Sequence, residues 1–259
     1  MSSSHRLSIK DLTVSYQRVP ALHHIDLELR CGKCVALLGP NGAGKTTFLK
    51  SLAGLLPFET GTVVFEGHEH THARHHTHRH QEPSRRGGSE RCIAYLPQRS
   101  VVDWDFPLTV RGLVEMGRFP ALGNWGRFKR EDRRIVQEAL AATHLQDLAD
   151  RQISALSGGQ QQRAFLARAW AQHAHIYLLD EPFTGLDRNA QTHLGELLRR
   201  LSAEEGKLVI VSHHDLKTVP DLFDQVIFLN GELVAFGDVA EVFTPERIAE
   251  TFSTHVFTG

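Results

Sequence analysis

The sequence predicts an α/β fold in which a buried sheet of parallel strands is interrupted by an inserted helical segment. Three observations support this prediction. The continuous apolar run at 34–38 is typical of a strand that is buried on both faces, and further strands are expected at 176–180 and 207–212. From about 107 to 172, apolar residues recur at three- and four-residue spacing, which is typical of helices. A glycine-rich motif at 39–46 directly follows the first of these strands.

The other elements follow in chain order. Alternating apolar residues predict two strands within 7–30, with Leu12, Val14 and Tyr16 on one face of the first. A helix is expected from about Lys45 to near Gly54. The remaining predicted elements are strands at 62–66 and 92–96, the helical segment, a strand at 176–180, a helix at 188–204, a strand at 207–212 and a hairpin at 226–237. The hairpin turns on Asn230-Gly231, a pair that two-residue turns favour.

Composition limits the function classes. The chain has 259 residues, of which 41% are hydrophobic and 23% charged, as in ordinary globular proteins. A net charge of −1 gives no basic field that would attract nucleic acid. No apolar run approaches the roughly 18 residues of a membrane-spanning helix. The start of the chain lacks the apolar region of a signal peptide, and three cysteines make no disulfide framework. We therefore expect a cytosolic chain that reaches a membrane only through a partner.

The segment GPNGAGKTT at 39–47 fits the pattern G-x-x-x-x-G-K-[ST] between a strand and a helix. Its glycines allow backbone N–H groups to curl around phosphate oxygens, and the helix N-terminus adds partial positive charge. Lys45 is expected to reach the β- and γ-phosphates, and Thr46 to bind Mg²⁺. The predicted nucleotide ligands in this segment are Gly39, Pro40, Asn41, Gly42, Ala43, Gly44, Lys45, Thr46 and Thr47.

Two acidic residues end the apolar run at 176–179. Asp180 stands where a parallel strand delivers side chains to the ligand-binding edge of the sheet, so we expect it to hold Mg²⁺. Glu181 points in another direction and is the candidate general base for hydrolysis. A solvated acidic pair at a strand end is the alternative interpretation.

LSGGQ at 156–160 precedes a run that reads as a helix. Ser157 is then placed near the helix N-cap, so the motif predicts a second anion site at a helix N-terminus. Kinases, GTPases and RecA-type motors share the first motif but lack this one. The predicted phosphate-binding residues here are Ser157, Gly158, Gly159 and Gln160.

With YLLDEP at 177–182 and SHHD at 212–215, the chain resembles an ABC transporter ATP-binding subunit over essentially its whole length. The resemblance implies a P-loop NTPase (RecA-like) core, an antiparallel β subdomain and an inserted helical ABC-signature subdomain. It also implies that two subunits face head to tail and hold ATP between the P-loop of one and the LSGGQ of the other. The implied roles are adenine stacking for Tyr16, Mg²⁺ and permease sensing for Gln98, a dimer-crossing contact for Asp187 and a γ-phosphate contact for His214.

Two of these roles have alternatives. Tyr16 also fits as a half-buried strand aromatic. His213 and His214 are adjacent, and the family pattern, which places the switch histidine directly before an Asp, selects His214. The resemblance thus gives Glu181, His214, Gln98 and Lys45 as catalytic residues, with Thr46, Gln98 and Asp180 as the Mg²⁺ ligands.

Residues 96–118 are similar to the ATPases of manganese, zinc and iron importers, which work with an extracytoplasmic metal-binding protein. This is also the region in which the family contacts its permease. Trp104, Asp105 and Phe106 would then lie near the permease. The alternative is that they only pack the helical subdomain.

Residues 68–80 read HEHTHARHHTHRH, with seven histidines in thirteen positions. Imidazole is a common zinc ligand, but the spacing specifies neither a strand nor a helix geometry. We expect exchangeable Zn²⁺ binding in a surface loop, and a solvated loop without a metal role is the alternative. The candidate ligands are His68, His70, His72, His75, His76, His78 and His80. Cys31 and Cys34 form a C-x-x-C in which packing is favoured over metal binding.

The sequence therefore predicts one ABC ATPase domain. Its expected parts are a nucleotide-binding core at 1–98 and 173–237, a helical subdomain at 99–172, the His-rich loop at 68–80 and a C-terminal tail at 238–259. The predicted function is ATP hydrolysis, with ATP and Mg²⁺, for import of a divalent metal, with zinc first and manganese or iron as alternatives. The expected partners are a second copy, a polytopic permease at the cytoplasmic face of the membrane and, indirectly, the metal-binding protein. A soluble non-transport ABC ATPase and a phosphotransferase are the competing hypotheses.

Overall fold

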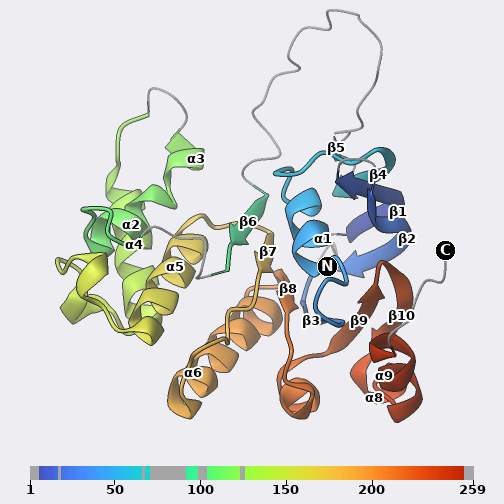
Figure 1. The fold of residues 1–259 in the computed structure, drawn as a ribbon. Coiled ribbons are helices and arrows are strands. Elements are labelled where there is room, and N and C mark those ends of the chain that lie inside the picture. Colours follow the sequence, from blue (N-terminus) through green and yellow to red (C-terminus); the bar gives the residue numbers. More distant parts are fainter. Residues whose placement is uncertain are drawn as a thin grey trace, which may run out of the picture.

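The computed structural model describes residues 6–16, 19–65, 68–70, 92–98, 104–122 and 126–253. Two sheets lie on one side of the molecule, and the helices α2 to α5 form a group on the other side (Figure 1). Among the described residues, no helix has the length and apolar character needed to cross a bilayer.

The larger sheet has six strands in the order β10-β9-β3-β8-β7-β6. Its neighbours are parallel except for the β9–β10 edge hairpin, in agreement with the sequence prediction. Connections that cross over between parallel strands explain why strands far apart in sequence are neighbours. The strands are β3 (Lys33–Leu38), β6 (Ile93–Leu96), β7 (Ile176–Leu179), β8 (Leu208–Ser212), β9 (Gln225–Asn230) and β10 (Glu232–Asp238).

The smaller sheet is antiparallel, in the order β2-β1-β4-β5. Its strands are β1 (Arg6–Tyr16), β2 (Val19–Arg30), β4 (Thr60–Phe65) and β5 (His68–His70). Strand β5 corrects the sequence prediction, because the His-rich segment does not begin as a loop. Val63 pairs with His70 and Phe65 with His68, so the chain returns along β4 and satisfies backbone groups that would otherwise be an open sheet edge.

The helices agree with the predicted pattern in the helical segment, and three further helices were not predicted: one before β9 and two at the C-terminus. They are α1 (Lys45–Leu52), α2 (Val110–Met116), α3 (Phe119–Leu122), α4 (Arg130–Ala142), α5 (Gly158–Ala171), α6 (Arg188–Arg199), α7 (Val219–Leu222), α8 (Val239–Val242) and α9 (Pro245–Phe252). A π-helical turn at Arg200–Glu204 extends α6. Helices α8 and α9 occupy the segment expected as a tail, and Thr244 caps α9 by accepting from the N–H of Arg247.

Strand β3 separates two hydrophobic cores. Cys34, Ala36 and Leu38 face a core shared with α2, α4, α5 and α6, whereas Val35 and Leu37 face a core shared with α1 and the antiparallel sheet. This alternation follows from the two-residue period of a strand and explains why every residue of β3 after Lys33 is apolar.

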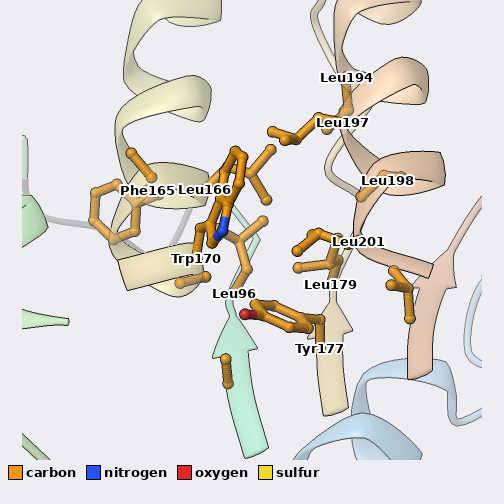
Figure 2. Packing of buried hydrophobic residues seen from close by; sticks show 14 of the residues in the cluster. Leu96, Phe165, Leu166, Trp170, Tyr177, Leu179, Leu194, Leu197, Leu198 and Leu201 are labelled. Atoms are coloured by element: carbon orange, nitrogen blue, oxygen red, sulfur yellow. The ribbon is translucent and has the colours of Figure 1, made fainter. Parts of the chain in front are cut away.

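Figure 2 shows the first core, where Phe165, Leu166 and Trp170 of α5 lie beside leucines of α6 and above β6 and β7. Leu96, Tyr177 and Leu179 supply the sheet side of this contact. The helical group is therefore packed onto the parallel sheet through α5, and this core fixes the position of the helix that follows LSGGQ.

Candidate active site

The polar motifs meet at one edge of the parallel sheet. The phosphate motif follows β3, Gln98 follows β6, Asp180 follows β7 and Ser212 ends β8. Backbone bonds join these strand ends, from the N–H of Asp180 to the Leu96 carbonyl (2.9 Å) and from that of His213 to the Leu37 carbonyl (3.1 Å). Because the strands are parallel, their carboxyl ends lie together, which is where α/β proteins bind ligands.

The loop at 39–44 is shaped for close approach of an anion. Gly44 precedes α1 with a φ of 90°, and no side chain caps the helix, so its first N–H groups remain available. A Cβ on Gly44 would lie 2.6 Å from Cδ2 of Leu22 and 2.8 Å from the Ala21 carbonyl oxygen. Packing of β2 against the loop therefore requires glycine at this position.

Lys45 lies folded against the same loop. Its Nζ donates to the carbonyls of Gly39 (2.7 Å) and Pro40 (2.9 Å). Partial burial lowers the pKa of Lys45, while the carboxylates of Glu181 and Asp180 act in the opposite direction. The ammonium group of Lys45, held at the loop by two neutral carbonyls, can exchange them for phosphate oxygens.

Asp180 is 1% exposed and sits between two hydroxyl groups. Thr46 Oγ1 donates to its Oδ2 (2.8 Å), and Ser212 Oγ donates to its Oδ1 (2.7 Å). Hydroxyl and carboxylate oxygens are the donors that Mg²⁺ prefers, so Thr46 and Asp180 fit the predicted metal. Gln98 is half-buried and follows β6, the strand beside β7, at the same edge.

Glu181 has a φ of 51°, in the left-handed region that costs a non-glycine residue about 1 kcal/mol. Its N–H donates to Ser212 Oγ (2.8 Å), and Thr184 Oγ1 donates to its Oε2 (3.4 Å). Ser212 thus bonds both the Asp180 carboxylate and the Glu181 backbone. Sequence reasoning assigned Ser212 no role, although it is the one hydroxyl residue in the apolar strand β8.

The two adjacent histidines differ in burial. His213 is buried at 3% exposure, in contact with Phe183 and Phe223, whereas His214 is exposed at the same sheet edge. Burial, with a contribution from His214, lowers the pKa of His213 to about 4. Of the two, His214 is therefore the ring that a nucleotide could contact.

The signature motif begins α5, as expected. Ser157 is the N-cap: its Oγ accepts from the N–H of Gln160 (3.4 Å), and Gln160 Oε1 accepts from the N–H of Ser157 (2.9 Å). This capping box leaves Ser157 exposed. Asp187 is likewise exposed and caps α6 through the N–H of Ala190 (2.8 Å).

Some predicted residues are not placed in full. Tyr16 ends β1, where its backbone pairs with Val19 near the loop-contacting residues of β2, but its side chain lies outside the description. The side chains of His68 and His70 are also not described, and His72, His75, His76, His78 and His80 lie wholly outside the described residues. Within the part of the chain that is described, His, Cys, Asp and Glu form no group of three or more placed to hold a metal. Cys34 is buried in the first core and Cys31 is half-buried; both are free thiols.

The family model for the ABC transporter matches residues 22–184 of this chain. The chain belongs to the ABC transporter family. This ABC ATPase is 40% identical, over 97% of its length and 94% of the relative's, to "Manganese transport system ATP-binding protein MntB" of Halalkalibacterium halodurans. It is 39% identical, over 98% of its length and 90% of the relative's, to "Zinc transport system ATP-binding protein TroB" of Treponema pallidum.

Solved structures agree with this assignment. The ABC ATPase matches a metal-chelate type ABC transporter in an inward-facing conformation with a TM-score of 0.77 at 27% identity, covering 95% of this chain and 88% of the other. It matches a dimeric bacterial ABC transporter cassette with a TM-score of 0.76 at 26% identity, covering 90% and 98%. The P-loop NTPase fold and the ATP-hydrolysing activity predicted from the sequence are confirmed.

Proposed function

We propose that this ABC ATPase powers the import of a divalent transition metal, with zinc as the first candidate and manganese as the second. The proposal rests chiefly on near full-length similarity to subunits named for manganese and zinc transport. Two relatives from Chlamydia, 42% identical to this chain, carry the broader name of probable metal transport system ATP-binding protein. The histidine content of residues 68–80 favours zinc, because imidazole is a common zinc ligand.

In the proposed mechanism, two copies of the chain bind ATP head to tail. The loop at 39–47 and Lys45 hold the phosphates from one copy, and Ser157 at the N-terminus of α5 closes the site from the other. Thr46, Asp180 and Gln98 would hold Mg²⁺, which would neutralise negative charge on the phosphates.

Hydrolysis then depends on two further residues. Glu181, held by Ser212, orients the attacking water and accepts its proton. His214 contacts the γ-phosphate and so distinguishes ATP from ADP. Asp187 crosses to the partner, and Tyr16 stacks on the adenine. Closing and reopening of the dimer would transmit the cycle to a membrane-embedded permease.

A groove on the helical group is the proposed permease contact. It is lined by Phe106, Leu108, Leu113, Met116, Ile153, Phe165 and Arg168. Phe106, one of these residues, is 57% exposed, an unusual value for an aromatic side chain. Trp104, in contrast, packs edge-on against Phe165 with ring centroids 5.0 Å apart, so it supports the groove rather than projecting from it. An apolar groove of this kind suits a short amphipathic helix of the permease. We place the chain at the cytoplasmic face of the membrane through this contact.

Growth rescue identifies the metal. A strain that lacks the chain should grow poorly in medium treated with a metal chelator, and one of zinc, manganese or iron should restore growth at the lowest added concentration. Rescue by zinc supports the first candidate, and rescue by manganese or iron selects an alternative. If the strain that lacks the chain grew as well as the parent strain in medium limited for zinc, for manganese and for iron, metal import would be contradicted.

A further inference from the structure

We propose that His213 is a positioning residue for ATP hydrolysis, which holds the segment carrying His214 against the segment that follows Glu181. The proposal rests on the roles proposed above for Glu181 and His214. Neither the motif pattern nor the similarity to relatives assigns His213 a role. Its evidence is the set of contacts that the buried ring makes.

The ring contacts two segments whose phenyl rings also contact each other, because the centroids of Phe183 and Phe223 are 6.5 Å apart. The centroid of the His213 ring is 5.1 Å from that of Phe183, in an edge-to-face arrangement at 73°. It is 5.3 Å from the centroid of Phe223, which follows α7. Phe183 is two residues after Glu181, so the position of the 181–185 segment depends on the shape and place of this ring.

The hydrogen bonds of His213 close the loop that follows it. Thr218 Oγ1 donates its proton to the Asp215 carbonyl (3.0 Å), because a carbonyl can only accept. The Thr218 hydroxyl must then accept from Nε2 of His213 (2.7 Å), so the ring carries its proton on Nε2. This relay from residue 213 through 218 to 215 fixes the turn in which His214 lies.

The neutral form of the ring is the one this relay needs. Burial lowers the pKa of His213 to about 4, and His214 adds to the effect, so the ring is neutral at physiological pH. Nδ1 then has no proton, and it has no hydrogen-bond partner among the described residues. Among the described residues, Nε2 of the ring therefore bonds Thr218, and the ring contacts those of Phe183, Phe223 and His214.

The segment after Glu181 and the loop after β8 line the same pocket, which the His213 ring also lines. Thr184 and Gly185 contribute from the segment after Glu181, and His214 and Asp215 contribute from the loop after β8. His213 lines the same pocket from the buried side. A displacement of this ring would therefore move the groups that face each other across the pocket.

The test removes the polar attachment without changing the shape of the loop. Thr218→Val keeps the volume but loses the hydroxyl, and His213→Phe keeps an aromatic ring but loses Nε2. We expect each to lower kcat about tenfold, because small displacements of catalytic groups have large kinetic effects, while the KM for ATP changes less than twofold. The double variant should be no slower than the slower single variant, since both changes remove the same bond. Thr218→Ser should restore turnover because it retains the hydroxyl.

Thr192→Val is the matched control. It removes an exposed hydroxyl that donates to the Arg188 carbonyl (3.0 Å) on α6, and it should leave kcat unchanged. Assays are run well below the melting temperature of every variant. Turnover of Thr218→Val equal to that of the parent would overturn the proposal, as would independent, multiplicative losses in the double variant. His214→Ala with parental turnover would instead overturn the role of His214, and the positioning role of His213 with it.

Discussion

At the scale of single residues, the backbone of Glu181 shows how the site is prepared. Its left-handed conformation is held by the bond from its N–H to Ser212, which also bonds Asp180. Such strained positions persist where the surrounding structure fixes them, and they concentrate at functional sites.

Glu181→Gln should retain ATP binding and lose hydrolysis. In the proposed mechanism Thr46, Asp180 and Lys45 would still hold Mg²⁺ and phosphate, while loss of the proposed general base should lower kcat by a factor of about 100 or more. When ATP and Mg²⁺ are added, the dimer of this variant should therefore accumulate. Size-exclusion chromatography with light scattering detects the dimer. Glu196→Gln, on the exposed face of α6, is the control and should hydrolyse ATP as the parent does. Near-parental turnover of Glu181→Gln would show that another residue activates the water.

Ser157→Arg should prevent dimer closure while the monomer still binds ATP. The P-loop is on a different part of the same chain, so only the partner's site is obstructed. Loss of the N-cap adds a modest destabilisation of about 1 kcal/mol. Nucleotide affinity and turnover are measured separately. If affinity is lost together with turnover, Ser157 supports the fold of its own subunit rather than the composite site.

The positions of residues within contiguous motifs could be predicted, because the order of residues in a P-loop or around an N-cap determines their local geometry. Lys45, Thr46, Asp180 and Ser157 lie where the motifs indicate. Ser212 could not be found in this way, since its role depends on contact between β7 and β8, which are far apart in sequence.

At the scale of elements, a buried ion pair links α4 and α5 to the segment that follows α2. Arg118 Nε lies 3.0 Å from Asp132 Oδ1, and its guanidinium also donates to the Ala171 carbonyl at the end of α5. Burial raises the pKa of Asp132, but the N–H of Lys129 and the Arg118 guanidinium outweigh it, so that its pKa is lowered overall. The ionised pair therefore stabilises the fold above the ordinary Asp pKa of about 4, and this contribution is lost as pH falls below it.

Asp132→Ala should destabilise the protein by about 3 kcal/mol at pH 7, because it leaves a buried guanidinium without its charge partner. The difference in melting temperature from the parent should shrink towards pH 3. Asp150→Ala, which breaks the exposed pair with Arg111, is the control and should change the melting temperature little. Equal effects of the two substitutions would contradict the buried role of Asp132.

A test of the His-rich segment requires a deletion that leaves strand β5 in place. Removing residues 71–80 retains His68–His70 as a strand, so folding and ATP hydrolysis should be unchanged. Zn²⁺ binding by the isolated subunit should fall, and parental binding should weaken below about pH 6, where imidazoles protonate. Calorimetric titration with Zn²⁺ and Mn²⁺ at two pH values measures both effects. Equal Zn²⁺ binding by parent and deletion would remove the metal role of the segment.

The sequence pattern predicted most of these elements, since β7, β3 after Lys33 and β8 before Ser212 are apolar and the β9–β10 hairpin has a strong turn signal. Strand β5 was not predicted, because three residues rich in histidine have no strand pattern and pair only through their backbone. Helices α8 and α9 were missed because four- and eight-residue helices depend on packing against β9 and β10.

At the scale of the whole molecule, two hydrophobic cores bring the ATP-binding edge and the helical group into one unit. In the proposed function, transport would require that the helical group move with the nucleotide state. The P-loop and the LSGGQ helix belong to different parts of that unit, which is the arrangement that a head-to-tail pair needs (Figure 1).

Metal content of cells tests the central claim most directly. Cells that lack the chain are supplied with the parent or with Glu181→Gln, grown under metal limitation and analysed by elemental mass spectrometry. We predict that the parent restores the content of one transition metal severalfold, zinc first, and that Glu181→Gln does not, while Mg²⁺ is equal in all cells. Zinc, manganese and iron contents that are the same with the parent, with Glu181→Gln and without the chain would contradict the account.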